Sequence, residues 1–532
     1  MRIRLWLSPV HASSRALRLG ALLGVAACSG SAHAGESDIA GRIAGGLRPR
    51  VDIAGEPAQT FDIQQRLRRY KVSSVSVAVI RDGKIAWAGV YRQPSAPAAD
   101  TDTLYQAASI SKGVTGVLAQ RLAGSNKLQL DGPVDACLRP WPLPAGQQSP
   151  EHPVTLRNLL NHTAGATVSG FPGYPPSQAI ATDLQVFKGE PPSLTPAVVI
   201  QTIPGAAYAY SGGGYTIAQV AMQQCLRTPF AELMRQQVLQ PLRMLRSTFA
   251  QPLPAAEHNR ARGHYADGSE VEGGAFVYPE LAAAGLWTTA SDLARFAIGV
   301  QQSWKIGTDF LSPTKARDLL TPALNNYAQG FFVVGDGEHK RFMHSGGNTG
   351  FKSTYAMYLD SGNGVVVMTD GDNGSYLGGE IVKAVASAYD WPDFKPRLAQ
   401  TAALDLATAT RHVGIYQLDN FEGRFANRYE LRFDGKDWTM VMPDIGATRL
   451  VPTGKTSLVS PETGDIIELT QDGAQDLLLI GGARPTAART AESSSFNEVS
   501  CRSASSFLAP RNRLDIVFMS NLRVHSVFRN VI

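Results

Sequence analysis

Ser109 and Lys112 are the two residues whose types and spacing most clearly indicate chemistry. They are three positions apart in Ser109-Ile110-Ser111-Lys112, and apolar residues at helical spacing predict a helix over residues 109–122. Side chains three positions apart share a helix face, so the Lys112 amine is expected beside the Ser109 hydroxyl. A serine hydroxyl becomes a good nucleophile when a base removes its proton, and burial lowers the pKa of a lysine amine enough for it to be that base. The spacing therefore predicts nucleophilic catalysis by Ser109.

The same four-residue spacing occurs at Ser312-Pro313-Thr314-Lys315. A serine followed by proline is typical of a helix start, with the serine as N-cap and the proline in the first turn. Ser312 is therefore predicted to be structural, and Ser109 remains the candidate nucleophile.

Two further segments combine a tyrosine or histidine with glycines: Tyr210-Ser211-Gly212 and His344-Ser345-Gly346. Glycine-rich bends let the backbone approach a ligand closely. His344 precedes a predicted strand, so its segment is expected to line a cleft at the edge of a sheet. Each segment is a weak signal by itself, because short motifs often occur by chance.

In this order, the three segments resemble the motifs of the serine β-lactamase and penicillin-binding protein superfamily, specifically its class C-like branch. That branch includes D-alanyl-D-alanine carboxypeptidases, D-amino-acid amidases and carboxylesterases with a β-lactamase fold. Ser109–Lys112 matches the S-x-x-K motif, Tyr210–Gly212 stands in place of Y-x-N, and His344–Gly346 matches H-x-G. The resemblance covers roughly residues 62–391.

The resemblance implies a role for each matched position. Ser109 would attack a carbonyl, and Lys112 and Tyr210 would share the proton transfers, with the first base left open. His344 would orient the substrate and support the tyrosine. Backbone N–H groups of Ser109 and Gly347 would form the oxyanion hole, and substrate contacts would come from Gly212, Ser345 and Gly346. No metal and no cofactor is implied, and no metal-ligand cluster is evident in the sequence.

One departure from the motifs bears on the substrate. The asparagine of the second motif is Gly212 here, so no side-chain amide is available there to hold a lactam amide. Esters or D-amino-acid peptides and amides are therefore favoured over β-lactams as substrates of an acyl-enzyme hydrolase. The alternative is a catalytically weak penicillin-recognising or cell-envelope binding protein that retains the motif residues.

The elements around these motifs predict an α+β fold. Residues 75–80 and 84–90 alternate in polarity around Asp82-Gly83, which predicts a β-hairpin. Further helices are expected at 61–70, 154–160, 215–226, 229–239, 291–300 (with Ser291 as N-cap) and 379–389. Strands are expected at 327–334, 353–359 and 364–369. Residues 171–204 are expected to be loop with few regular elements. The order suits an antiparallel sheet flanked by helices with an all-helical insertion, the β-lactamase-like arrangement, over residues 55–392.

Short alternating strands predict a second domain at residues 405–485, a small β-barrel or sandwich after a linker-like stretch over 392–406. It contains no catalytic constellation. The tail from residue 486 to 532 has no predicted structure.

The first 34 residues have the pattern of a secretory signal peptide. Four arginines precede an apolar run over residues 19–28, and no acidic residue occurs before Glu36. Cleavage after Ala34 would release a soluble periplasmic or secreted protein, whereas cleavage before Cys28 would leave a lipid anchor, the only membrane attachment expected. The formal charge of +5 then falls to about +1 in the mature chain, so its basicity gives no support for nucleic-acid binding. The expected partner is a small-molecule or peptide substrate.

Three cysteines follow the predicted leader: Cys137, Cys225 and Cys501. An exported protein can hold a disulfide, and Cys137 with Cys225 is one compatible pair. Isolated buried thiols are equally compatible with this count.

Overall fold

The computed structural model describes residues 38–138, 141–417, 428–472, 475–480 and 488–489. The predicted signal peptide, including Cys28, and most of the predicted tail, including Cys501, lie outside the described residues. Within the described part of the chain, no helix is long and apolar enough to span a bilayer.

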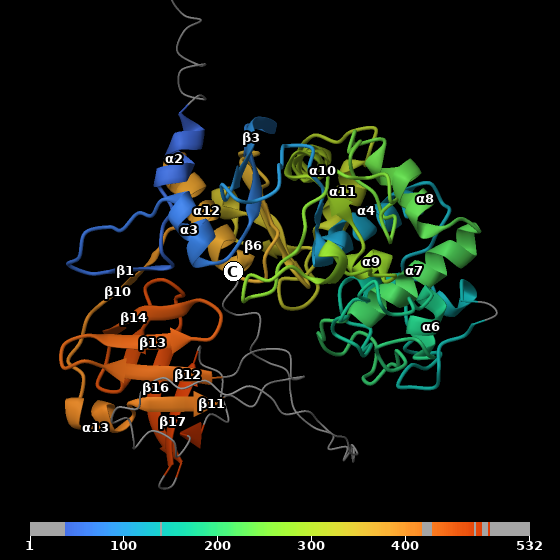
Figure 1. Ribbon diagram of the computed structural model, residues 1–532. Helices are drawn as coiled ribbons and strands as arrows, with labels where there is room; N and C mark the ends of the chain where they lie inside the picture. The colour runs from blue at the N-terminus through green and yellow to red at the C-terminus, as the bar shows by residue number, and fades with distance from the viewer. Residues whose placement is uncertain (1–37, 139–140, 418–427, 473–474, 481–487, 490–532) are drawn as a thin grey trace, which may run out of the picture. The chain divides into compact units, whose positions relative to one another are not determined.

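A six-stranded antiparallel sheet with the order β3-β2-β9-β8-β7-β6 forms the centre of the larger part of the chain, before the β-domain (Figure 1). Its strands are β2 (Ser74–Arg81), β3 (Lys84–Arg92), β6 (Phe332–Val334), β7 (Arg341–Asn348), β8 (Phe351–Tyr358) and β9 (Gly364–Thr369). Asp82 and Gly83 link β2 to β3 with φ values of 50° and 71°, the left-handed conformation that a two-residue hairpin turn requires. The predicted hairpin is confirmed.

Alternating side chains of β2 and β9 supply two separate cores. Val75, Val77 and Val79 of β2 join the core under α12, whereas Ala78 and Ile80 join the core shared with the helical part. This follows from the two-residue period of a strand. The sheet is therefore apolar on both faces, with α12 packed against β8 and β9 and α10 against β2 and β9.

The helices divide between these two faces. The α12 face carries α2 (Ile39–Gly45), α3 (Ile63–Arg69) and α12 (Gly374–Ala388). The other face carries α4 (Ser111–Gly124), α5 (Leu156–Leu160), α6 (Asp183–Lys188), α7 (Gly212–Leu226), α8 (Phe230–Met234), α9 (Leu281–Ala284), α10 (Ala290–Lys305) and α11 (Pro313–Leu319). Short helical turns are η1 (Ala108–Ile110), η2 (Val134–Ala136), η3 (Arg235–Leu239), η4 (Glu272–Gly274) and η5 (Gly337–His339), and β4 (Tyr105–Gln106) pairs with β5 (Trp287–Thr288).

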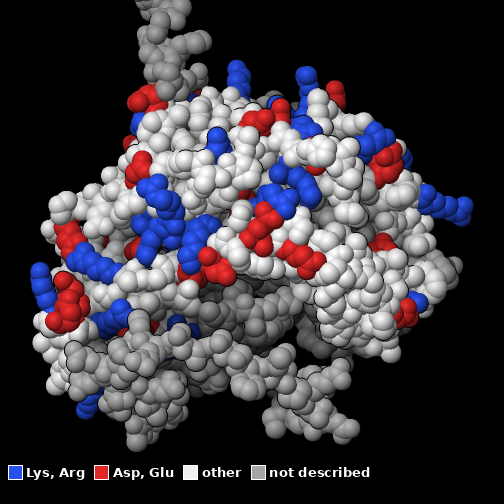
Figure 2. Space-filling model, viewed as in Figure 1, with Lys and Arg blue, Asp and Glu red and all other residues white. Residues whose placement is uncertain are grey.

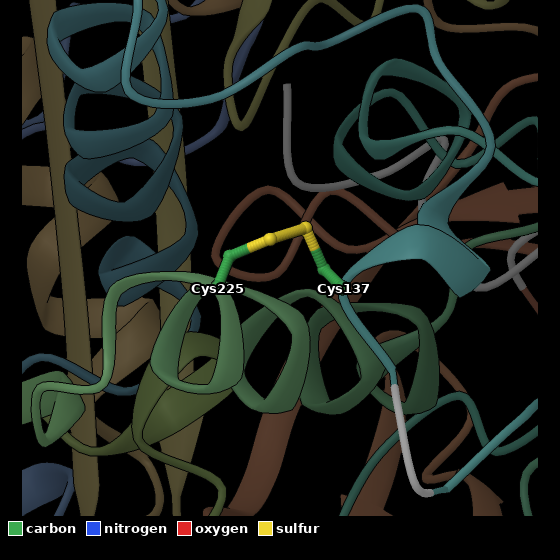
Figure 3. Close-up of a disulfide and its surroundings, with 2 residues drawn as sticks. All are labelled: Cys137 and Cys225. Carbon is green, nitrogen blue, oxygen red and sulfur yellow. A yellow bond between two sulfur atoms is a disulfide. The ribbon is translucent and has the colours of Figure 1, made fainter.

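A disulfide joins Cys137, just after η2, to Cys225 near the end of α7 (Figure 3). The two residues are 88 positions apart in the chain, so the bond closes a long loop across the helical part. Of the two interpretations that the sequence left open, the structure selects the disulfide.

The β-domain is a closed antiparallel barrel, so of the two predicted forms the barrel is the one observed. Its strands are β11 (Gly414–Gln417), β12 (Arg428–Phe433), β13 (Trp438–Met442), β14 (Gly446–Pro452), β15 (Ser457–Val459), β16 (Ile466–Asp472), β17 (Gln475–Ile480) and β18 (Ala488–Arg489). The two-residue strand β18 closes the barrel by pairing with both β17 and β11. Before it, β10 (Arg397–Ala399) pairs in parallel with β1 (Val51–Ile53), and α13 (Leu406–Arg411) follows.

Basic side chains gather over α3 on the face shown in Figure 2. Two arginines of α3 bind the barrel: the guanidinium groups of Arg66 and Arg69 donate to the Glu462 carboxylate at 2.9 and 3.0 Å. Arg66 also pairs with Glu380 of α12 at 2.9 Å. Arg66 and Arg69 therefore link α3 to α12 and the barrel.

Several predicted boundaries were wrong for identifiable reasons. The strand expected at 327–334 is confined to β6, because Gly330 takes a φ of 92° and interrupts it. The helix expected at 291–300 begins earlier, since Thr289 and not Ser291 accepts the N-cap hydrogen bond from Asp292. The stretch over 171–204, expected to be loop with few regular elements, contains one short helix, α6, which begins at a capping box between Thr182 and Gln185.

Candidate active site

Ser109 lies in η1, the single turn that leads into α4. The preceding residue, Ala108, has a φ of 50°, so the chain bends sharply just before the serine. The Lys112 side chain, from the first turn of α4, is 2% exposed. Its Nζ donates to Ser109 Oγ at 3.1 Å and to the Ala283 carbonyl at 2.9 Å. The spacing on which the sequence argument rested is therefore a hydrogen bond in the structure.

Burial lowers the pKa of Lys112 to about 7. Neither of its two hydrogen-bond partners is acidic, so nothing in these contacts offsets the loss of hydration of the ammonium form. A large fraction of the amine is consequently neutral near pH 7. A neutral amine in contact with a serine hydroxyl can accept its proton.

The α9 turn closes over this lysine because its residues are small. Ala282, Ala283 and Ala284 are all buried, and the Thr115 hydroxyl donates to the Ala282 carbonyl at 3.0 Å. The Leu286 amide donates to Ser111 Oγ at 3.0 Å. These bonds between α4 and α9 remove water from the Lys112 amine.

Tyr210 is placed by the start of α7. Ser211 is the N-cap, accepting a hydrogen bond of 2.9 Å from the Gly214 amide. The Tyr210 hydroxyl is hydrogen-bonded to the Ser109 side chain, and Lys112 Nζ lies 5.0 Å from the centre of its ring. Burial raises the pKa of Tyr210 well above its ordinary value, more than the bond with Ser109 lowers it. The phenol is thus protonated at neutral pH and is suited to donate a proton.

His344 reaches the same cluster from β7. It is 3% exposed, and its ring centre is 6.5 Å from that of Tyr210. Nδ1 lies 2.6 Å from the Ser345 carbonyl and Nε2 lies 3.2 Å from the Tyr327 hydroxyl. Burial, and next the charge of Lys112, lower its pKa to about 3. The imidazole is therefore neutral, and because a carbonyl can only accept, Nδ1 carries the proton and Nε2 accepts from Tyr327.

His344 was expected just before a strand, but it lies inside β7. Gly346 and Gly347 have low strand propensity, which conceals the strand in the sequence. The ladder with β8, with His344 opposite Tyr355 and Gly347 opposite Lys352, holds the segment extended.

The strand β7 passes directly beside η1, the turn that contains Ser109. A Cβ on Gly346 would lie 2.1 Å from the Ala107 carbonyl oxygen, so only glycine allows this approach. The predicted oxyanion donors, the amides of Ser109 and Gly347, thus belong to neighbouring segments. Their role stays a prediction.

Two of the predicted substrate contacts place no side chain beside Ser109 and Lys112: Ser345 points its hydroxyl elsewhere, and Gly212 has no side chain. The Ser345 hydroxyl bonds to Thr354 Oγ1 at 3.1 Å, on the opposite strand face from His344. A Cβ on Gly212 would lie 2.6 Å from the ring of Phe171. Phe171 therefore occupies the space that the asparagine of a Y-x-N motif would use.

Two residues that the motif argument did not assign, His162 and Tyr327, complete the cluster. The His162 ring centre lies 4.3 Å from that of Tyr210 and 4.6 Å from that of Tyr327, and its Nδ1 accepts from the Ser211 amide at 3.1 Å. Burial lowers its pKa well below the ordinary value, and the charge of Lys112 adds to this. Its φ of 61°, unusual for a residue other than glycine, shows that the fold holds it in place.

Ser312 is the N-cap of α11, accepting from the Lys315 amide at 3.4 Å, as the sequence predicted. Among the described residues, no group of three or more His, Cys, Asp or Glu side chains is arranged to hold a metal ion.

An antiparallel sheet between two helical layers, with a serine, a buried lysine and a tyrosine in contact, defines the β-lactamase class of hydrolase folds. The Beta-lactamase family profile matches residues 62–387. The chain belongs to this family.

Comparison with individual proteins agrees with this assignment. The chain is 24% identical to Protein flp of Staphylococcus aureus over 341 residues, which are 60% of this chain and 64% of that protein. It is also 24% identical to Penicillin-binding protein 4* of Bacillus subtilis over 355 residues, 60% of this chain and 73% of that protein. The chain thus spans somewhat less than two thirds of the length of Protein flp.

Solved structures share the fold at lower identity. The octameric penicillin-binding protein homologue from Pyrococcus abyssi superposes with a TM-score of 0.54 at 17% identity, covering 80% of this chain and 98% of that one. The D-amino acid amidase from Ochrobactrum anthropi gives 0.51 at 18% identity, over 66% and 98% of the two chains. EstCE1, a hydrolase with promiscuous acyltransferase activity, gives 0.50 at 18% identity, over 66% and 99%.

Proposed function

We propose that this protein is an exported serine hydrolase that cleaves esters or D-amino-acid peptides and amides through an acyl-enzyme. The observation that carries the proposal is the 3.1 Å contact between the buried amine of Lys112 and Ser109 Oγ. An amine whose pKa burial lowers to about 7 has little structural reason to be inside a protein core, since placing it there costs free energy. Its position beside a serine hydroxyl is explained by proton transfer.

In the proposed acylation step, neutral Lys112 accepts the proton of Ser109 while Oγ bonds to the substrate carbonyl carbon. The carbonyl oxygen becomes an oxyanion, held by the amides of Ser109 and Gly347. Tyr210, whose pKa burial raises, donates its proton to the leaving alcohol or amine as the bond to the carbonyl carbon breaks. In this proposal Lys112 is the first base, which its lowered pKa supports.

In the deacylation step, water attacks the acyl carbon and loses a proton to the Tyr210 phenolate, which gave up its proton during acylation. Ser109 Oγ then leaves and takes back the proton that Lys112 holds, which frees the carboxylic acid and restores the serine hydroxyl, the neutral amine and the phenol. His344 does not exchange protons in this scheme at neutral pH, because its pKa is lowered to about 3. Its neutral ring orients Tyr327 and borders the tyrosine cluster.

The ring of Phe171 beside Gly212 supports esters and D-amino-acid substrates over β-lactams. It fills the place of the amide that a Y-x-N motif presents, and it makes that wall of the site apolar. The D-amino acid amidase and the hydrolase EstCE1 among the structural neighbours are compatible with this preference. The Cys137–Cys225 disulfide supports export, because such bonds persist in oxidising compartments.

The test is active-site labelling with a fluorophosphonate, followed by assays on nitrophenyl esters, D-alanyl peptides and a chromogenic cephalosporin. Wild type should be labelled and should turn over an ester or a D-peptide. Ser109→Ala should lose both signals, whereas Ser312→Ala should keep them and lose only about 1 kcal/mol of stability, the usual value of an N-cap. Equal activity of Ser109→Ala and wild type would reject the nucleophile, and stable labelling without turnover would favour the binding-protein alternative.

A further inference from the structure

A cavity of about 440 Å³ lies between the central sheet and α12. Thr354 of β8 and Thr369 of β9 line it from the sheet, and α12 lines it with Gly374, Gly378 and Val382. A Cβ on Gly378 would lie 3.6 Å from Thr354 Cγ2, in ordinary van der Waals contact, so side chains longer than alanine on this helix face would enter the space. The small residues of α12 therefore keep the cavity open.

This cavity is separate from the catalytic cluster. Ser345 lines it, whereas the preceding residue of β7, His344, belongs to the cluster around Tyr210. Consecutive side chains of a strand point to opposite faces of a sheet. The cavity and the catalytic cluster thus share β7 but lie on its two sides.

The lining is rich in positive charge. Six cationic side chains border the cavity, and no Asp or Glu is among its lining residues in the described part of the chain: Arg50, Arg341, Lys352, Lys383, Lys395 and Arg397. Three of them have carboxylate partners outside the lining: Arg341 with Asp393 at 3.0 Å, Lys352 with Asp372 at 2.7 Å and Lys395 with Asp390 at 3.8 Å.

Lys383 and Arg397 are held by backbone carbonyls. Lys383 Nζ lies 3.5 Å from the Gly379 carbonyl, a long contact, and Arg397 Nη2 donates to the Gly464 carbonyl at 3.2 Å. Both positions retain donors that can turn toward a ligand, since an ammonium has three N–H groups and a guanidinium five.

Lys383 also faces another cation. Burial and next the charge of Arg50 lower the pKa of Lys383 to about 8, while the charge of Glu380 raises it. Glu380 is itself bound by Arg66 at 2.9 Å and by the Tyr70 hydroxyl at 2.7 Å. Arg50 also lies near Asp465, whose pKa burial raises and the charge of Arg50 partly brings back down. A bound anion between Arg50 and Lys383 would relieve their repulsion.

The rest of the lining is divided between hydroxyl groups and apolar groups. The side chains of Thr354, Thr369 and Thr463 carry hydroxyls, and Met343, Val382 and Phe394 are apolar. Arginine, lysine and hydroxyl donors are the groups that bind phosphate oxygens. A volume of 440 Å³ exceeds what a bare phosphate requires and lies in the range of pockets for small organic ligands.

We propose that this cavity binds a small organic phosphate, with Lys383, Arg50 and Arg397 around the phosphate group and the apolar residues around its organic part. The site is independent of the proposed hydrolysis, because none of these residues belongs to the catalytic cluster.

The experiment is calorimetric titration of the full chain with phenyl phosphate, inorganic phosphate and phenol at constant ionic strength. Phenyl phosphate should bind saturably and more tightly than inorganic phosphate, and phenol should not bind measurably. Lys383→Met and Arg397→Gln should each weaken phenyl phosphate by about tenfold or more, the loss of one charge-assisted contact. Lys84→Met, an exposed lysine on β3 at the far edge of the sheet, is the matched control and should bind as wild type does.

Absence of saturable binding at millimolar phenyl phosphate would overturn the proposal. Unchanged affinity for phenyl phosphate in both Lys383→Met and Arg397→Gln would also overturn it. Equal affinity for phenyl phosphate and inorganic phosphate would reject an organic ligand. Melting curves show whether each variant folds. If Lys383→Met does not fold, the Arg397→Gln variant decides the outcome, because Arg397 is exposed and its replacement is tolerated more easily. Repeating the titration after fluorophosphonate treatment should leave the affinity unchanged, because the catalytic serine lies on the other side of β7.

Discussion

The amide of Ser211 donates a hydrogen bond of 3.1 Å to Nδ1 of His162, 49 positions earlier in the chain. Ser211 follows Tyr210 directly, and the His162 ring lies against the Tyr210 ring, with the ring centres 4.3 Å apart and the planes tilted by 44°. One imidazole therefore holds both the backbone and the ring of the proposed acid. Because burial lowers the pKa of His162, it stays neutral and keeps Nδ1 as an acceptor.

Replacing His162 should consequently impair catalysis through Tyr210. We expect His162→Phe, which retains an aromatic ring but has no acceptor, to lower kcat by about tenfold to a hundredfold with little change in KM. This loss is smaller than the roughly 10²–10⁴-fold effect of removing a general acid itself. Steady-state kinetics on an ester measure this loss of kcat. Tyr208→Phe is the control, because it changes another side chain beside His162, with ring centres 5.9 Å apart, and leaves the bond between Ser211 and His162 in place. A change confined to KM would contradict a positioning role.

The pH dependence of acylation should follow Lys112. The neutral amine is the active form, so kcat/KM should rise as the pH increases through about 7, the lowered pKa of this group, and should be largely lost one unit or more below it. His344, with a pKa lowered to about 3, should add no inflection between pH 5 and 9. A rate profile with its rise near pH 10 would show that the Lys112 amine is not desolvated in solution.

The disulfide should contribute substantially to stability. Its two cysteines are 88 positions apart, and closing a loop of that length restricts the unfolded chain by about 4.6 kcal/mol in the loop-entropy picture, with measured values commonly between about 2 and 4 kcal/mol. The double variant Cys137→Ser/Cys225→Ser should therefore melt at a lower temperature than wild type. Adding a reductant should lower the melting temperature of wild type and leave that of the variant unchanged. Identical melting temperatures for the two proteins would contradict the prediction.

Gly212→Asn should lower ester hydrolysis without producing cephalosporin hydrolysis. The new side chain meets the Phe171 ring, which already lies 2.6 Å from the Cβ position. The double variant Gly212→Asn/Phe171→Ala makes room and should raise cephalosporin turnover above that of either single variant. Assays with a chromogenic cephalosporin test both statements. If Gly212→Asn alone hydrolyses the cephalosporin well, Phe171 does not limit the substrate range.

Local sequence patterns predicted the elements whose stabilising contacts are local. The hairpin around Asp82-Gly83 depends on a turn that two adjacent residues specify, and the N-cap at Ser312 depends on its next three neighbours. Predictions failed where distant contacts decide. The strand that contains His344 has two glycines and exists because β8 pairs with it along its length.

The sequence by itself determined the relation between Ser109 and Lys112, because three positions of helix bring two side chains together whatever the rest of the chain does. It also indicated the α+β class through the periods of its apolar residues, and the resemblance of its motifs named Tyr210 and His344. Only the tertiary structure decided the charge states in the cluster, since the lowered pKa of Lys112 arises from burial under α9. It also decided the pairing of Cys137 with Cys225, the support that His162 gives to Tyr210, and the cationic cavity behind β7. Each of these depends on residues that are far apart in the chain, and the packing of the sheet and helices brings them within contact distance.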